Sequence, residues 1–144
     1  MEVESRTEVL LEDYIKILHI EALTMLEIAK RGIVPAVLEC EEDVAGTLRT
    51  KMEISDKISH KLEDTLLGKL TALADALTER IDALEAAVAN APEGEETLKL
   101  ASYFGGNVIA AMAALRETVD ALELIVDDRL WPLPNYGEIL YSVK

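Results

Sequence analysis

The fold is decided by residues 59–90, which run SHKLEDTLLGKLTALADALTERIDALEAAVAN. Apolar side chains recur there at intervals of three and four residues, a spacing that places them on one face of an α-helix. Gly68 is the one residue that weakens a helix there, and a glycine in a helix interior costs about 1 kcal/mol. We therefore predict a long amphipathic helix over 59–90, whose apolar stripe consists of Leu62, Leu66, Leu70, Leu73, Leu77, Ile81, Leu84 and Val88.

A second apolar stripe lies on the N-terminal side, over residues 6–53. The sequence KRG at 30–32 looks like a helix end, and Pro35 follows it, yet the stripe keeps its phase across both. A true turn would usually reset the phase, so we predict one helix over 6–53, kinked near 33–35, with a turn at Pro35 as the alternative. The next helix is expected to follow a turn within 53–60. The stripe consists of Leu11, Ile15, Leu18, Ala22, Leu26, Ala29, Ile33, Val37, Cys40, Val44 and Leu48.

Further apolar residues widen this second stripe in its first half, at Leu10, Tyr14, Ile17 and Met25. A helix whose apolar face is this broad is usually covered by more than one neighbour. The pattern therefore predicts that the N-terminal part of the chain is buried on more than one side.

A third helical pattern covers residues 95–128 and follows a loop with the sequence NAPEG at 90–94. Gly105 and Gly106 lower the stability of a helix at this point, because glycine loses the most backbone freedom on folding. With the alanines that follow, they form a flat face that another helix can approach closely. A local hinge at the glycine pair is the alternative.

Three long helices with short connections predict an all-α fold, an up-and-down antiparallel helical bundle. The chain has 144 residues, of which 50% are hydrophobic, enough for the core of one domain over residues 1–144. Residues 129–144 follow the last helix as a non-helical tail that contains tryptophan and proline.

Charge and cysteine content limit the classes of function. The net charge of −14 disfavours nucleic acid and anionic membranes as partners, because both require clustered Lys and Arg. The single cysteine, Cys40, excludes an internal disulfide and fits a cytoplasmic protein. The N-terminus is acidic, unlike a signal peptide, and the longest uncharged run, 100–115, is short for a membrane span. We expect an acidic, cytoplasmic protein with no membrane span.

Few residues offer catalytic or metal-binding chemistry. His19 could in principle bind a metal or act as a general base, but no second histidine lies one turn away, so we expect a histidine satisfied within the bundle. A di-iron site is rejected because Lys16 and Lys57, rather than glutamates, precede the two histidines by three residues. Cys40 falls on the apolar stripe as a small buried hydrophobe. We therefore expect no catalytic, cofactor-binding or metal-binding residue.

The C-terminal tail gathers the bulkiest apolar side chains of a chain that is 4% aromatic, in the sequence WPLPNYGEILY at 131–141. Two prolines two residues apart cannot continue a helix, and a disordered tail would not normally gather such groups. We predict that the tail docks on its own bundle, on another domain or on a neighbouring subunit. The candidate docking residues are Trp131, Pro132, Pro134, Tyr136, Leu140 and Tyr141.

Three stretches of the chain resemble one enzyme family. Residues 20–36, IEALTMLEIAKRGIVPA, resemble the long helix near the end of type III glutamine synthetases, and residues 101–123, ASYFGGNVIAAMAALRETVDALE, resemble the helix that follows it. The tail at 131–141 resembles that family's C-terminal signature and is the most specific of the three. Asn135, where threonine is expected, departs from the pattern, as does the Gly105-Gly106 pair.

The resemblance implies a role without chemistry of its own. The family is an ATP- and divalent-metal-dependent ligase that joins ammonia to glutamate, with its catalytic residues on a sheet-rich domain upstream. None of those motifs and no strand pattern occurs in this chain, so the resemblance extends to the C-terminal helical region alone. It implies a non-catalytic structural and oligomerisation domain, with the catalytic domain of the same enzyme and neighbouring subunits of a homo-oligomer as partners.

Two stand-alone roles remain open as alternatives. One is a signalling or phosphotransfer bundle with His60 as the phosphoacceptor, although Glu63 and Asp64 would repel an incoming phosphoryl group. The other is a coiled-coil adaptor that self-associates through the stripe from Leu62 to Val88.

Overall fold

All regular structure in this protein is helical. The structure, a computed structural model, describes residues 2–94 and 96–134. No strand occurs within these ranges, so the predicted all-α helical bundle is confirmed. The helices and two π-helical turns are α1 (Glu2–Ile28), η1 (Ala29–Ile33), α2 (Val34–Ile54), α3 (Lys61–Ala89), α4 (Thr97–Tyr103), η2 (Phe104–Val108) and α5 (Ile109–Glu123).

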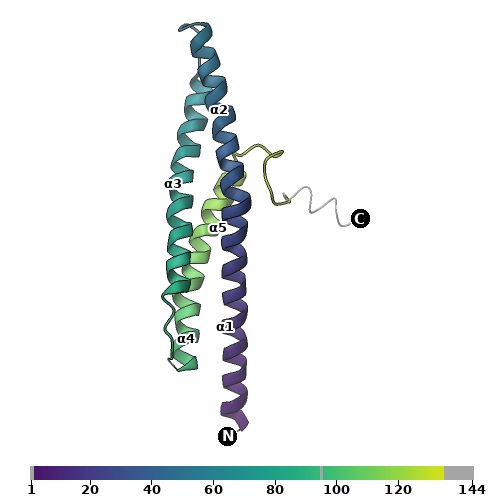
Figure 1. The fold of residues 1–144 in the computed structure, drawn as a ribbon, viewed down its shortest axis with the longest axis vertical. Coiled ribbons are helices and arrows are strands. Elements are labelled where there is room, and N and C mark those ends of the chain that lie inside the picture. Colours follow the sequence, from purple (N-terminus) through teal and green to yellow (C-terminus); the bar gives the residue numbers. More distant parts are fainter. Residues whose placement is uncertain (1, 95, 135–144) are drawn as a thin grey trace, which may run out of the picture.

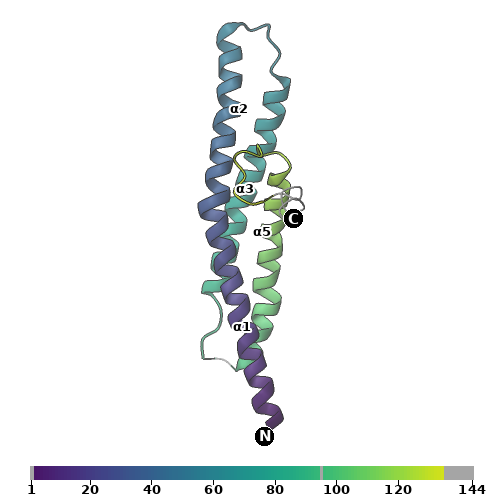
Figure 2. The same cartoon turned by 90° about the vertical axis from the view of Figure 1, so that its right-hand side faces the viewer.

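The helices form three antiparallel rods (Figure 1). The first rod consists of α1, η1 and α2, the second is α3, and the third consists of α4, η2 and α5. Residues 55–60 connect α2 to α3, within the 53–60 window that the sequence indicates. Figure 2 shows that the third rod ends partway along the molecule, so that α2 and the first part of α3 project beyond it as a two-helix hairpin. The tip of this hairpin lies at the opposite end of the molecule from the N-terminus.

The first rod passes Pro35 without a turn. Helical structure continues from Glu2 to Ile54, with the π-helical turn Ala29–Ile33 directly before α2 and Pro35 in the first turn of α2. Proline has no N–H to donate, and its ring clashes with the carbonyl four residues earlier in a regular α-helix. A single-turn π-helical insertion is a common way for a helix to absorb such a disturbance. The structure thus has one continuous rod, while the size of the predicted kink stays a prediction.

The second π-helical turn lies at the glycine pair of the third rod. A Cβ atom on Gly105 would lie 3.1 Å from the hydroxyl oxygen of Tyr14, whereas one on Gly106 would meet nothing within 4 Å. Gly105 therefore allows α1 to approach closely. Gly106 does not contribute to the predicted flat packing face.

The third rod ends earlier than the sequence predicts. α5 stops at Glu123 rather than near residue 128, and the backbone N–H groups of Ile125 and Val126 then both bond to the carbonyl of Leu122, at 3.1 and 2.9 Å. Val126 is still buried, with 6% of its surface exposed. The apolar spacing thus continues past Leu122 without further helix, which is why the periodic pattern extended the helix too far.

All three rods contribute to the core. The α3 stripe turns inward over most of its length, but Leu62 is 66% exposed because no third helix covers the hairpin near its tip. Cys40 is 5% exposed and lies in the core as a small buried side chain, as predicted. The largest fully buried side chains are Ile33, Leu70, Leu84, Leu115, Leu122 and Val108.

Candidate functional site

The tail begins on the surface of its own bundle. Trp131 is 8% exposed and belongs to the core cluster, although its indole Nε1–H has no acceptor among the described residues. Pro132 lies over Gly32, where an added Cβ would be 3.2 Å from the proline Cγ. Pro134 is exposed. The other predicted docking residues, Tyr136, Leu140 and Tyr141, lie outside the described residues.

A groove of about 620 Å³ runs between α1 and α5. Leu133 from the tail lines it, and the exposed charged side chains of Glu21, Arg116 and Asp120 also face it. The sequence pattern did not identify this groove, because it forms where the side faces of two stripes meet. Its apolar lining includes Ile20, Met25 and Ile28 from α1 and Met112, Leu115 and Val119 from α5.

Several large apolar side chains of α1 are exposed. The exposed fraction is 69% for Leu10 and 56% for Ile17, and Tyr14 is 40% exposed. Figure 1 shows that the N-terminal tip of α1 extends past the neighbouring rods. The prediction that these residues are buried on more than one side is therefore wrong for the chain by itself. A contiguous apolar surface of this kind typically marks a contact with another domain or protein.

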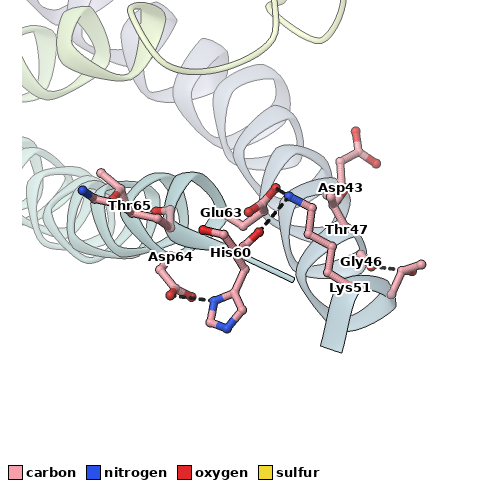
Figure 3. A network of polar contacts seen from close by, with 11 residues as sticks. Asp43, Gly46, Thr47, Lys51, His60, Glu63, Asp64 and Thr65 are labelled. Carbon is pink, nitrogen blue, oxygen red and sulfur yellow. Dashed lines mark hydrogen bonds and ion pairs between the residues drawn. The ribbon is translucent and has the colours of Figure 1, made fainter. Parts of the chain in front are cut away.

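An ion pair ties α2 to α3 near the tip of the hairpin (Figure 3). The ammonium nitrogen of Lys51 lies 2.6 Å from Oε1 of Glu63 and also donates to the carbonyl of Ser59 at 3.3 Å. The side chain of Glu63 is only 8% exposed, and its second oxygen, Oε2, has no partner among the described residues. The hydrogen bond from Lys51 has the largest effect on the Glu63 carboxyl and lowers its pKa below its usual range, and a bond from the backbone N–H of Glu63 lowers the pKa further.

Neither stand-alone alternative is favoured by these contacts. Nδ1 of His60 lies 2.8 Å from Oδ2 of Asp64 (Figure 3), and the carboxylate of Glu63 is on the same turn of helix. Two carboxylates beside an imidazole oppose the approach of a phosphoryl group. The coiled-coil adaptor would need a free seam on α3, whereas the middle of the stripe is buried within this chain at Leu70, Leu77, Ile81 and Leu84.

His19 lies at the surface of the bundle. It is exposed, and its ring meets that of Phe104 edge-on, with the centroids 6.1 Å apart. The prediction of a histidine satisfied within the bundle is therefore wrong, because His19 follows the buried Leu18 and points away from the same face. In residues 2–94 and 96–134, no group of three or more His, Cys, Asp or Glu side chains could hold a metal ion. The absence of a cofactor in this chain stays a prediction.

One stretch meets the length and hydropathy requirements of a membrane span. Thr97–Glu123 meets them by length and composition alone, with 28% of its most apolar window buried in the bundle. The core helix of a soluble bundle meets the same criteria, so this observation is weak evidence for a membrane. The predicted absence of a membrane span stays a prediction.

Comparison with known proteins points to one enzyme class. The family model described as the glutamine synthetase C-terminal domain matches residues 1–52. A glutamine synthetase of Butyrivibrio fibrisolvens is 33% identical over 146 residues, which cover 99% of this chain and 20% of that protein. A type-3 glutamine synthetase of Dictyostelium discoideum is 29% identical over 145 residues, covering 98% of this chain and 20% of that protein. A glutamine synthetase of Bacteroides fragilis is 25% identical over 148 residues, with the same two coverages. The chain spans about a fifth of the length of these relatives.

Proposed function

This chain is related to the C-terminal domain of glutamine synthetases, and we propose that it acts as a non-catalytic structural domain of such an enzyme. In this proposal it supports the catalytic domain and helps to build a homo-oligomer in the cytoplasm. The similarity covers nearly the whole chain but only 20% of each relative, which leaves most of a relative's length for the residues that bind ATP, metal, ammonia and glutamate.

The observation that carries the proposal is the exposed apolar face of α1 that includes Leu10 and Ile17. Leu10 and Ile17 are each more than half exposed, at 69% and 56%, so the described part of this chain leaves most of their surface uncovered. Burying an apolar side chain of this size contributes about 1.5–3 kcal/mol relative to leaving it in water. The face therefore favours a contact with another part of the enzyme. It also lies within residues 1–52, the segment that the family model matches.

The arrangement of charges supports a structural rather than a catalytic role. The most buried carboxylate, that of Glu63, is bonded to Lys51 across the hairpin, where it holds two helices together. Its pKa is lowered, the opposite of what a general acid near neutral pH requires. Glu85 pairs with Lys30 and so links α3 to the first rod, while Glu27 with Arg31 and Glu53 with Arg49 form exposed pairs within one helix.

The proposal is tested by binding between this chain and the rest of an enzyme. The Butyrivibrio fibrisolvens glutamine synthetase is expressed without the fifth that matches this chain, and purified chain is added while sedimentation velocity is recorded. We expect a complex with the wild-type chain. Ile17→Glu is expected to raise the dissociation constant at least tenfold, about 1.4 kcal/mol, because a charge enters an apolar contact.

Leu38→Glu is the matched control, because Leu38 is 61% exposed on α2, beyond the apolar face of α1. Leu38→Glu should bind with the wild-type dissociation constant. The free energy of unfolding of both variants should stay within about 0.5 kcal/mol of the wild-type value, as expected for exposed sites. No complex with the wild-type chain, or equal affinities for the two variants, would contradict the proposal.

A further inference from the structure

The groove between α1 and α5 has a candidate occupant within the chain. We propose that the C-terminal segment 135–144, which lies outside the described residues, docks into this groove. The inference does not depend on the proposed function, since it concerns the chain by itself.

The groove presents apolar surface that a partner would cover. Ile20 is 62% and Ile28 39% exposed on its α1 side, and the half-buried Met112 lies on its α5 side. Its volume of about 620 Å³ is enough for several side chains of a short peptide segment. The occupant must therefore bring large apolar groups in close sequence.

The path of the described tail leads to the groove. Trp131 is buried in the core, Pro132 lies over Gly32, and Leu133 is itself part of the groove lining. The segment thus starts only two residues after a residue that already lines the groove. Such a short tether gives the segment a millimolar effective concentration at the groove, an advantage over any partner that has to diffuse to it.

The length and composition of the segment fit the groove. Ten residues in extended conformation span about 33 Å. The α1 side of the groove runs from Ile33 to Ile20, 13 residues of helix or about 20 Å. The segment can therefore reach along the whole groove. Its apolar side chains are Tyr136, Ile139, Leu140, Tyr141 and Val143.

The charges of the segment can also be matched in the groove. Glu138 is its one acidic residue and Lys144 its one basic residue. Arg116 faces the groove, is exposed, and has no ion pair among the described residues, so it offers a partner for Glu138. Glu21 and Asp120, which also face the groove, offer partners for Lys144.

Methionine methyl groups provide a direct test. The chain has four methionines, of which Met25 and Met112 line the groove, while Met52 is 56% exposed near the hairpin tip and serves as an internal control. With ¹³C-methyl methionine, NMR spectra are compared between the full chain and a variant that ends at Pro134. We expect the methyl resonances of Met25 and Met112 to move by more than a line width, because the tyrosine rings of the segment are lost, whereas Met52 stays in place.

Point variants separate docking from any general effect of truncation. Tyr136→Ser is expected to shift the same two resonances, and Ser142→Ala, a conservative change in the same segment, to leave them in place. An unchanged Met52 signal in every variant shows that the shifts are confined to the groove. The proposal is overturned if Met25 and Met112 do not respond to loss of the segment. It is equally overturned if their positions in the full chain depend on protein concentration, which would assign the groove to a second copy.

Discussion

Replacing Trp131 with alanine tests whether the tail is an integral part of this bundle. The side chain is 8% exposed and packs with the core. A tryptophan buries about 200 Å², which at about 25 cal/mol per Å² corresponds to about 5 kcal/mol. Two effects reduce this value: the unfolded chain already buries part of its surface, and the indole N–H has no acceptor among the described residues, which costs about 1–3 kcal/mol. We expect Trp131→Ala to lower the free energy of unfolding by about 3 kcal/mol.

The assay is thermal unfolding followed by circular dichroism. For 144 residues, an entropy of unfolding of about 2.1 cal/mol/K per residue gives about 0.3 kcal/mol/K, so 3 kcal/mol corresponds to a fall in Tm of about 10 °C. Trp131→Phe should cost much less, because it keeps an aromatic ring and removes the unpaired N–H. Pro134→Ala is the control, since Pro134 is exposed and the change should stay within about 0.5 kcal/mol. If Trp131→Ala melts at the wild-type temperature, the ring does not stabilise its own bundle, which would contradict the prediction.

Two further predictions concern the hairpin and the glycines. Because the folded pKa of Glu63 is lowered, its stabilising effect is fully present above its unfolded pKa of about 4.3 and is lost as the pH falls through the folded value. The Tm of Glu63→Gln should therefore fall less steeply than that of the wild type between about pH 5 and about pH 3. Glu53→Gln, which removes an exposed pair, is the control and should follow the wild-type curve. If the Tm of Glu63→Gln runs parallel to that of the wild type over this pH range, the ion pair does not stabilise the fold. Gly68→Ala should raise the free energy of unfolding by about 1 kcal/mol, because nothing lies within 4 Å of the added Cβ. Gly32→Ala should raise the free energy of unfolding by less than Gly68→Ala, because its Cβ would lie 3.2 Å from Cγ of Pro132. Both free energies are measured by urea unfolding. Equal increases for the two variants would show that Pro132 does not stay packed over Gly32.

The helices were predictable wherever their apolar side chains are buried in this chain. The stripe of α3 is regular because Leu70, Leu77 and Leu84 each face the core. The continuity of the first rod past Pro35 followed from an unbroken phase. The π-helical turns were not predictable, because they change the hydrogen bonding of one turn without moving the apolar residues off the stripe.

Less of the candidate surfaces could be predicted from the sequence. Leu10 and Ile17 have the spacing of buried residues but are exposed, because periodicity does not distinguish a face that packs on its own chain from one that packs elsewhere. The pair between Lys51 and Glu63 joins residues on either side of a turn, so it depends on the residue at which that turn closes the hairpin. The burial of Trp131 was one of three docking options that composition alone left open.

The proposed function requires that this chain has no glutamine synthetase activity of its own and supports the catalytic part of such an enzyme. It is tested most directly by measuring ATP-dependent glutamine formation while the chain is titrated into a Butyrivibrio fibrisolvens enzyme that lacks the matching fifth. We expect no product from the chain alone and a rate that rises and saturates as the chain is added. Product from the chain alone, or a rate that the chain does not change, would contradict it.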